Sequence, residues 1–156
     1  MTDHGTPEGY TSLTPFLCVT DGAAAISFYT EVFGAQLVSK MELPTGGIAH
    51  AELQFASGRL QLADAMPEYE LAAPDGGPVD THSIALYCPD TDAVFERAVA
   101  AGATVREPPS TFVTGDRFAS VRDPFGHRWT IMTRVEEVSD EEGERRLAEW
   151  SGSSLS

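Results

Sequence analysis

Apolar and polar positions along the chain predict one order of elements that occurs twice. The first part predicts a strand, a helix and three strands at residues 13–19, 21–34, 35–43, 47–56 and 59–64. The second part repeats this order at residues 82–88, 90–102, 103–108, 116–123 and 127–133. The stretch "AMPEYELAAPDGGPVD" between them predicts a linker loop at residues 65–80. The sequence therefore predicts two βαβββ modules, at residues 12–64 and 81–135.

The ends of the two predicted helices carry matching residues. Asp21 and Asp90 stand where each helix begins, and a carboxylate there accepts backbone N–H bonds and favours the helix dipole. Gly34 and Gly102 stand where each helix ends, as residues suited to a left-handed C-cap. These matches support the repeat, because the modules share few identical residues.

Strand alternation assigns side chains of the first module to two faces of a sheet. A two-residue turn at Ser57 and Gly58 pairs Phe55 with Leu60 and directs the apolar face toward the helix. The opposite face then carries the polar or small residues His50, Glu52, Gln54, Gln61 and Ala63.

The same argument applies to the second module, where "DPFG" suits a type I turn. Pairing Arg122 with His127 directs Phe118, Ser120, Trp129 and Ile131 toward the helix. His127 is therefore expected to be structural. The opposite face receives Arg117, Ala119, Thr130 and Met132.

Each module thus presents a semi-polar sheet face, and two such faces curved toward each other would enclose a cavity. Small residues such as Ala63, Ala85 and Ala119 leave room for one, although a solvated sheet face would show the same alternation. The candidate ligand-binding residues of this cavity are Thr14, Phe16, His50, Glu52, Gln61, Ser83, Arg117, Thr130 and Met132.

Composition narrows the range of partners. The chain has 156 residues and a net charge of −14, and this acidity argues against binding to nucleic acid. The sequence contains no apolar run of membrane-spanning length and no secretory signal, and its two cysteines suit a reduced compartment. We expect a cytoplasmic protein that does not bind membranes, with a flexible N-terminus at residues 1–11 and an acidic tail at residues 136–156.

Several motifs resemble the vicinal oxygen chelate superfamily, which includes glyoxalase I, ring-cleaving dioxygenases and bleomycin and fosfomycin resistance proteins. "VTDGAAAISFYTEVFGA" is similar to its opening, and "AVAAGATV" and "VRDPFGHRWTI" are similar to its second-module signatures. "IAHAEL", "GDR" and "DPFGHRWTI" followed by "VEEVSDEE" resemble the PhnB-like branch. The resemblance covers residues 12–142. It implies an α+β fold in which paired βαβββ modules form an eight-stranded incomplete barrel, and it implies a homodimer.

Metal enzymes of this superfamily carry His, Gln or Glu ligands on the first, fourth, fifth and eighth strands. The resemblance maps these positions to Thr14, Gln61, Ser83 and Thr130. Hydroxyl groups are poor ligands for divalent ions, because they offer neither a basic lone pair nor a charge. The sequence therefore departs from the metal-binding pattern, and we expect no metal at these positions.

Two rearrangements would restore a metal site. A one-residue slip of the fifth strand would turn His82 inward, at the cost of moving Ile84 and Leu86 to the wrong face. Alternatively, His50 and Glu52 share a face and could bind an ion, with Asp64 or Arg117 completing the set. Arg117 would repel a cation, and we expect it to pair with a carboxylate such as Glu52. A divalent cofactor is disfavoured on these grounds without being ruled out.

Three functional hypotheses follow. In the first, the protein binds a small molecule without a metal, sequestering a cationic or drug-like ligand that its acidic surface attracts. In the second, it is a divalent-metal-dependent lyase, isomerase or dioxygenase with a rearranged site around His50 and Glu52. In the third, a small dimer has its cavity filled by its own Phe16, Phe112 and Met132. Whether the protein is an enzyme stays open between the first two hypotheses.

Overall fold

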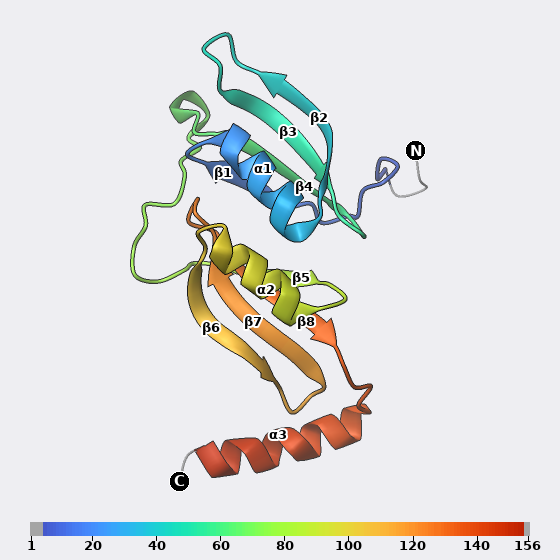
Figure 1. Cartoon of the computed structure of the whole chain (residues 1–156). Helices are drawn as coiled ribbons and strands as arrows, with labels where there is room; N and C mark the ends of the chain where they lie inside the picture. Colours follow the sequence, from blue (N-terminus) through green and yellow to red (C-terminus); the bar gives the residue numbers. More distant parts are fainter. Residues whose placement is uncertain (1–4, 155–156) are drawn as a thin grey trace. The chain divides into compact units, whose positions relative to one another are not determined.

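A computed structural model describes residues 5–154 and divides the chain into two compact units. The first unit extends to Asp80 and includes Pro124–His127, and the second contains Thr81–Asp123 and the residues from Arg128 onward. Each unit is a four-stranded sheet with one helix packed on one face (Figure 1). This arrangement confirms the α+β class and the two predicted βαβββ modules.

The first unit follows the predicted order of elements, and its strands lie in the spatial order β1-β4-β3-β2. Strand β1 runs parallel to β4, and the other neighbouring strands are antiparallel. The loop after β4 contains a short 3-10 helix, η1. The elements are β1 (Phe16–Val19), α1 (Gly22–Phe33), β2 (Gln36–Glu42), β3 (Ile48–Gln54), β4 (Arg59–Asp64) and η1 (Pro67–Tyr69).

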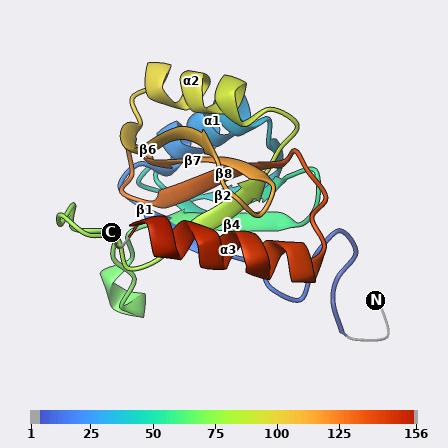
Figure 2. The same cartoon turned by 90° about the horizontal axis from the view of Figure 1, so that it is seen from below.

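The second unit repeats this topology in the order β5-β8-β7-β6, with β5 parallel to β8. In Figure 2, helix α2 forms one layer, and strands β6, β7 and β8 form a second layer. A further helix, α3, follows the last strand. The elements are β5 (Ile84–Tyr87), α2 (Thr91–Ala100), β6 (Thr104–Thr111), β7 (Asp116–Arg122), β8 (Arg128–Arg134) and α3 (Asp140–Ser154).

Three of the four predicted helix caps form, whereas the C-cap of α2 is Ala101, and Gly102 follows it with a φ of 100°. Asp21 Oδ1 accepts a hydrogen bond from Ala24 N at 2.9 Å, and Asp90 Oδ1 accepts one from Ala93 N at 3.0 Å. Gly34 follows α1 with a φ of 72°, the left-handed conformation that favours glycine.

A tie between the last strand and the helix N-terminus recurs in both units. Asp64, at the end of β4, accepts hydrogen bonds from Gly22 N at 2.7 Å and from Ile48 N at 2.5 Å. In the second unit, the hydroxyl of Thr133 on β8 accepts a hydrogen bond from Thr91 N at 3.0 Å. Gly22 and Thr91 each begin a helix, so their N–H groups have no partner within the helix. The side chains of Asp64 and Thr133 supply the missing acceptors.

The first hairpin is paired two residues away from the predicted register. Leu53 lies opposite Leu60, where the sequence predicted Phe55. A shift of two residues leaves every side chain on its face. Leu53, Leu60 and Leu62 are accordingly buried in the core, as expected.

The second hairpin differs by one residue, and the predicted faces of β7 are wrong. Arg122 pairs with Arg128 instead of His127, so Ala119 and Val121 lie on the buried face that also carries Trp129. The turn is one residue longer than predicted and spans residues 123–127. Asp123, its first residue, accepts a hydrogen bond from the Trp129 indole at 2.8 Å. Arg117 therefore lies on the helix side, while Phe118 and Ser120 lie on the opposite face with Thr130 and Met132.

The turn residues 124–127 group with the first unit. His127 is buried in the loop ahead of β8, and its Nε2 lies 2.9 Å from Cys18 O. Phe125 packs edge-on against Phe28 of α1, with 6.0 Å between ring centroids. The expectation of a structural His127 is confirmed, although His127 precedes the strand instead of opening it.

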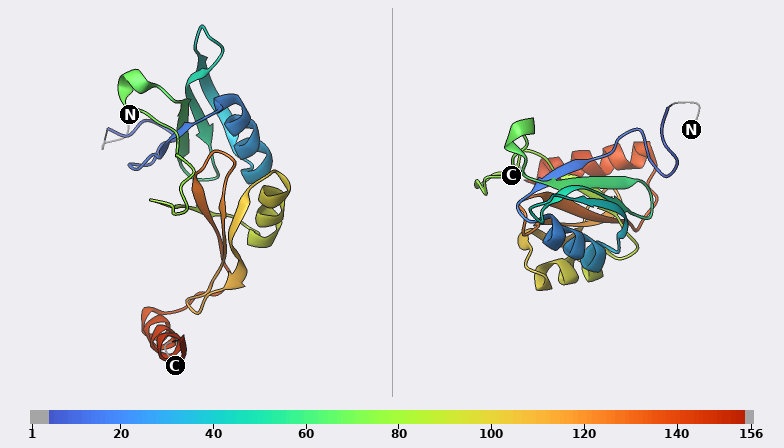
Figure 3. Two further views of the ribbon diagram at one scale, coloured as in Figure 1. Left: turned by 90° about the vertical axis from the view of Figure 1, so that its left-hand side faces the viewer. Right: turned by 90° about the horizontal axis from the view of Figure 1, so that it is seen from above.

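The acidic segment after β8 contains α3, which lies beyond the loop between β6 and β7 (Figure 3). Trp150 of α3 packs edge-on against Phe112, with ring centroids 5.3 Å apart. Arg146 bonds Val113 O at 3.3 Å and forms an ion pair with Glu136 at 2.8 Å. Within residues 5–154, no helix has the length and apolar character needed to cross a membrane.

Asp64→Ala removes the acceptor of two backbone N–H groups. We expect the free energy of unfolding to fall by about 2–4 kcal/mol, because each donor loses its partner. Urea denaturation measures this difference. Asp75→Ala is the matched control, since Asp75 bonds Gly77 N in an exposed loop and its removal should cost less than about 1 kcal/mol. An equal fall in the free energy of unfolding in the two variants would contradict a structural role for the hydrogen bonds of Asp64.

Candidate functional site

The face of the first sheet opposite α1 carries a row of polar side chains. Glu52 of β3 lies opposite Gln61 of β4, and Gln54 lies opposite Arg59. Since Leu53, Leu60 and Leu62 alternate with these residues and are buried, the polar residues point away from the core. The strands thus hold Glu52, Gln54, Arg59 and Gln61 on one surface, which we call the polar face.

Glu52 is the centre of the polar face. Its Oε2 lies 3.1 Å from Arg59 Nη1, and its Oε1 lies 3.6 Å from His50 Nε2. The Glu52 side chain is 20% exposed and that of Arg59 is 19% exposed, so the ion pair is partly shielded from water. Arg59 also donates from Nε to Gln54 Oε1 at 3.0 Å. The carboxylate therefore already has a cationic partner in a well-connected group.

Tyr10 completes this group from the segment ahead of β1. The Arg59 guanidinium carbon lies 4.5 Å from the centre of the Tyr10 ring, and Gln61 Nε2 lies 3.4 Å from the Tyr10 hydroxyl oxygen. A hydrogen bond from Tyr10 lowers the pKa of Glu52, against desolvation, and His50 and the Arg59 charge lower it further. Glu52 is therefore ionised at neutral pH.

An apolar border adjoins the polar face. The Phe16 ring lies 6.1 Å from the His50 ring, centroid to centroid, and is 39% exposed. Met41 of β2 lies opposite His50 and is 62% exposed. Thr14 lies ahead of β1 instead of within it, and its hydroxyl donates to Thr11 O at 3.4 Å.

The second unit carries its candidates on the corresponding face. Ser83 Oγ and Thr130 Oγ1 lie 2.7 Å apart and form a hydrogen bond, so each hydroxyl has the other as partner. Met132 lies two residues beyond Thr130 and opposite Phe118. On the same face, Glu107 Oε2 bonds Arg128 at 2.7 Å and Ser120 at 2.6 Å. Phe112 packs against Trp150, so its side chain contributes to the contact with α3.

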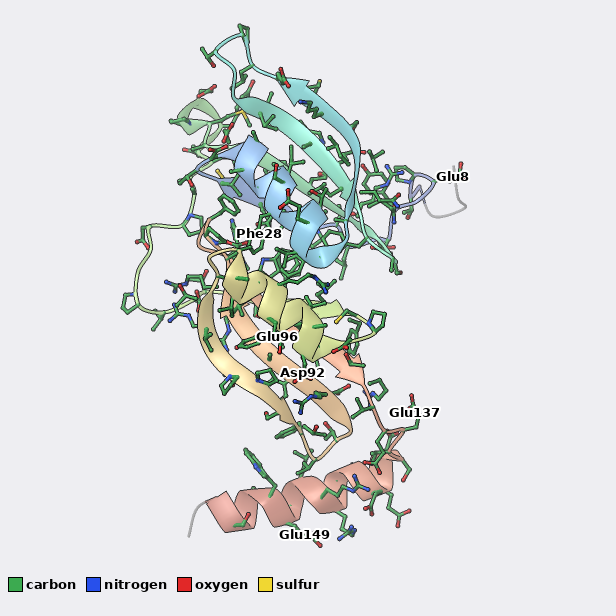
Figure 4. All side chains as sticks on the ribbon, viewed as in Figure 1. Glu8, Phe28, Asp92, Glu96, Glu137 and Glu149 are labelled. Carbon is green, nitrogen blue, oxygen red and sulfur yellow. The ribbon has the colours of Figure 1, made fainter. Side chains whose placement is uncertain are left out.

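Arg117 does not lie on this face, and its predicted orientation is wrong. Its Nη2 donates to Asp92 Oδ1 at 2.6 Å, and its Nε donates to Asp92 Oδ2 in a second, shorter bond. Asp92 lies on α2 (Figure 4). The fork of hydrogen bonds raises the pKa of Arg117 and lowers that of Asp92. Arg117 does pair with a carboxylate, as expected, but that carboxylate belongs to the helix, and Arg59 is the partner of Glu52.

The donor groups of the two sheet faces do not fit a divalent metal ion. The four positions mapped by resemblance hold hydroxyls or an amide, and two of these hydroxyls bond each other. Glu52 and His50 are neighbours, yet Arg59 beside them repels a cation, and Asp64 uses both oxygens on backbone N–H groups. Over residues 5–154, no group of three or more His, Cys, Asp or Glu side chains could hold an ion.

His82 does not rescue a metal site either. Ser83 bonds Thr130 and Ala85 lies opposite Thr130, so β5 has the register predicted without a slip. His82 is exposed, with its Nδ1 3.2 Å from the Thr81 hydroxyl.

The sequence analysis missed two residues that contact Glu52 or its neighbours on the polar face. Arg59 stands two positions before Gln61 on the same strand, so alternation could have placed it on the same face. Tyr10 lies in a segment expected to be flexible and belongs to no periodic element, so no sequence signal could have found it.

Comparisons with known proteins agree with this architecture. The family model of the Glyoxalase/Bleomycin resistance protein/Dioxygenase superfamily matches residues 10–131. An uncharacterised protein of Mycobacterium bovis is 37% identical over 137 residues, which cover 84% of this chain and 88% of that protein. Lactoylglutathione lyase of Arabidopsis thaliana is 30% identical over 118 residues, which cover 74% of this chain and 41% of the lyase.

Among solved structures, a PhnB protein from Bacillus cereus has the same fold, with a TM-score of 0.62 at 19% sequence identity. The similarity covers 79% of this chain and 99% of the PhnB protein. With two βαβββ units and a family match that spans most of both, the chain belongs to the glyoxalase/bleomycin resistance protein/dioxygenase superfamily.

Proposed function

We propose that this superfamily member binds a small molecule without using a metal ion, and that its ligand is cationic or drug-like. In this proposal the protein acts as a cytoplasmic homodimer. The observation that carries the proposal is the charge balance of the polar face, where Glu52 is already paired with Arg59 at 3.1 Å. A balanced, hydrogen-bonded group of this kind suits an organic ligand better than a bare divalent ion.

The border of the polar face supports an organic ligand. Phe16 and Met41 offer exposed apolar surface beside the partly exposed imidazole of His50. A ligand that covers both surfaces gains from burying apolar area and from a few directed hydrogen bonds.

The acidity of the chain supports a cationic ligand. A net charge of −14 produces a negative potential that attracts cations toward the protein and speeds their association. Glu52 stays ionised because its pKa is lowered, so its carboxylate, although paired with Arg59, can still accept a hydrogen bond from an N–H group of such a ligand.

An enzyme that uses a divalent metal is the alternative. His50 Nε2 and Glu52 Oε1 lie 3.6 Å apart, and Gln61 lies opposite Glu52, so three donor groups of suitable kinds meet on one face. For these groups to bind an ion, Arg59 would have to leave Glu52. A lyase, isomerase or dioxygenase of this kind would therefore need a rearranged site.

Glu52→Gln should weaken ligand binding. Isothermal titration calorimetry against a panel of cationic antibiotics should show saturable binding to the unchanged protein and about tenfold weaker binding to the variant, because a partly buried charge is lost. Glu137→Gln removes the same charge from an exposed position ahead of α3 (Figure 4) and is the matched control. Heat signals without saturation across the panel, or equal losses in both variants, would contradict the proposal.

The stabilising effect of Glu52 should depend on pH. Its folded-state pKa lies below the value of about 4.3 in an unfolded chain, so the ionised carboxylate stabilises the fold above that pH. This contribution is lost as the pH falls through the lowered folded-state pKa. Urea titrations should show a difference between the unchanged protein and Glu52→Gln that is largest near neutrality and shrinks on acidification. A difference that grows as the pH falls would show the opposite linkage.

A further inference from the structure

We infer that residues 5–14 form a strap that occupies the polar face with Tyr10, and that the natural ligand inserts a phenol-type ring in place of Tyr10. The inference rests on the proposed function, because it names the class of ligand for the same site. It adds a regulatory step, since the strap must leave before the ligand can bind.

Tyr10 makes the contacts that a bound phenol would make. Its ring face lies 4.5 Å from the Arg59 guanidinium carbon, a distance typical of a cation–π contact. Its hydroxyl oxygen lies 3.4 Å from Gln61 Nε2, and hydrogen bonding from this hydroxyl lowers the pKa of Glu52. A phenol offers one flat face and one hydroxyl, and these are the features that Arg59, Glu52 and Gln61 engage.

Two hydrogen bonds of the strap link residues within the strap itself. Tyr10 N donates to Pro7 O at 3.1 Å, and the Thr11 hydroxyl donates to Leu13 O at 2.7 Å, so both bonds stay within the segment. Leu13 is 85% exposed and adds little apolar packing. Segments with exposed backbone and few buried contacts open at low free-energy cost. Tyr10 anchors the strap to the polar face through Arg59 and Gln61, and a competing ring can displace it.

Gly9 controls how the strap fits against the sheet. It adopts a φ of 82°, and an added Cβ would lie 2.8 Å from Arg59 Nη2. An L residue strains this backbone conformation, so Gly9→Ala should loosen the strap while Tyr10 and its neighbours Arg59, Glu52 and Gln61 are all kept in the chain. Gly46 is a matched control in the loop between β2 and β3, with a φ of 93° and nothing within 4 Å of an added Cβ.

The probe is p-cresol, the side chain of tyrosine as a free molecule, with toluene as the analogue that lacks the hydroxyl. Because only molecules with an open strap bind the probe, the apparent association constant is the intrinsic constant multiplied by the open fraction. We therefore expect calorimetry to show about tenfold tighter p-cresol binding to Gly9→Ala than to the unchanged protein or Gly46→Ala. Tyr10→Ala, which vacates the face, should bind at least as tightly and should prefer p-cresol to toluene.

Two further measurements separate a displaceable strap from a fixed structural segment. In the unchanged protein, saturating p-cresol should speed amide hydrogen exchange in residues 5–14, because the ligand releases the strap. In Tyr10→Ala, adding Glu52→Ala should reduce the preference for p-cresol over toluene, because the hydroxyl loses the carboxylate that accepts its hydrogen bond.

Failure of Tyr10→Ala to bind p-cresol would overturn the inference. Binding that leaves strap exchange unchanged, or a preference for p-cresol that stays intact in Tyr10→Ala with Glu52→Ala, would place the probe elsewhere and would also overturn the inference. Neither result affects Glu52-dependent binding of the antibiotic panel, so this inference and the proposed function fail separately.

Discussion

A hydrogen bond between the last strand and the first helical N–H fixes the architecture of each unit. In the first unit Asp64 bonds Gly22 N, and in the second Thr133 bonds Thr91 N. Each bond holds the start of the helix against one side of the sheet, so side chains on the other side point away from the helix. The position of the polar face follows from this tie, because alternation along β3 and β4 then directs Glu52 and Gln61 away from the helix.

The sequence predicted the modular fold because its determinants are local. Hydrophobic periodicity marked the strands and helices, and Asp21, Asp90 and Gly34 marked helix ends that the structure confirms. The register of paired strands was harder to predict from the sequence, because it depends on how many residues the turn between them contains. In the first hairpin the predicted register was wrong by two residues, so the predicted faces were still correct. In the second hairpin it was wrong by one residue, so Arg117 was assigned to the wrong face.

The candidate site could be predicted only in part. His50, Glu52 and Gln61 lie together on the first sheet, as alternation along two strands implies. The partner of Glu52 could not be identified, because an ion pair depends on which side chains meet across a register. Tyr10 was beyond reach for a different reason: its segment has no periodicity, and the tyrosine is held by Arg59 and Gln61 rather than by a regular element.

The central claim is that Arg59, and no metal ion, is the cationic partner of Glu52. It is tested most directly by inductively coupled plasma mass spectrometry on protein purified without chelator and then incubated with Zn, Ni, Mn and Fe(II). We predict that the protein retains no ion in stoichiometric amount and that His50→Ala does not change this result. Retention of about one ion per chain that is lost in His50→Ala would contradict the account. It would make His50 and Glu52 the centre of a metal enzyme.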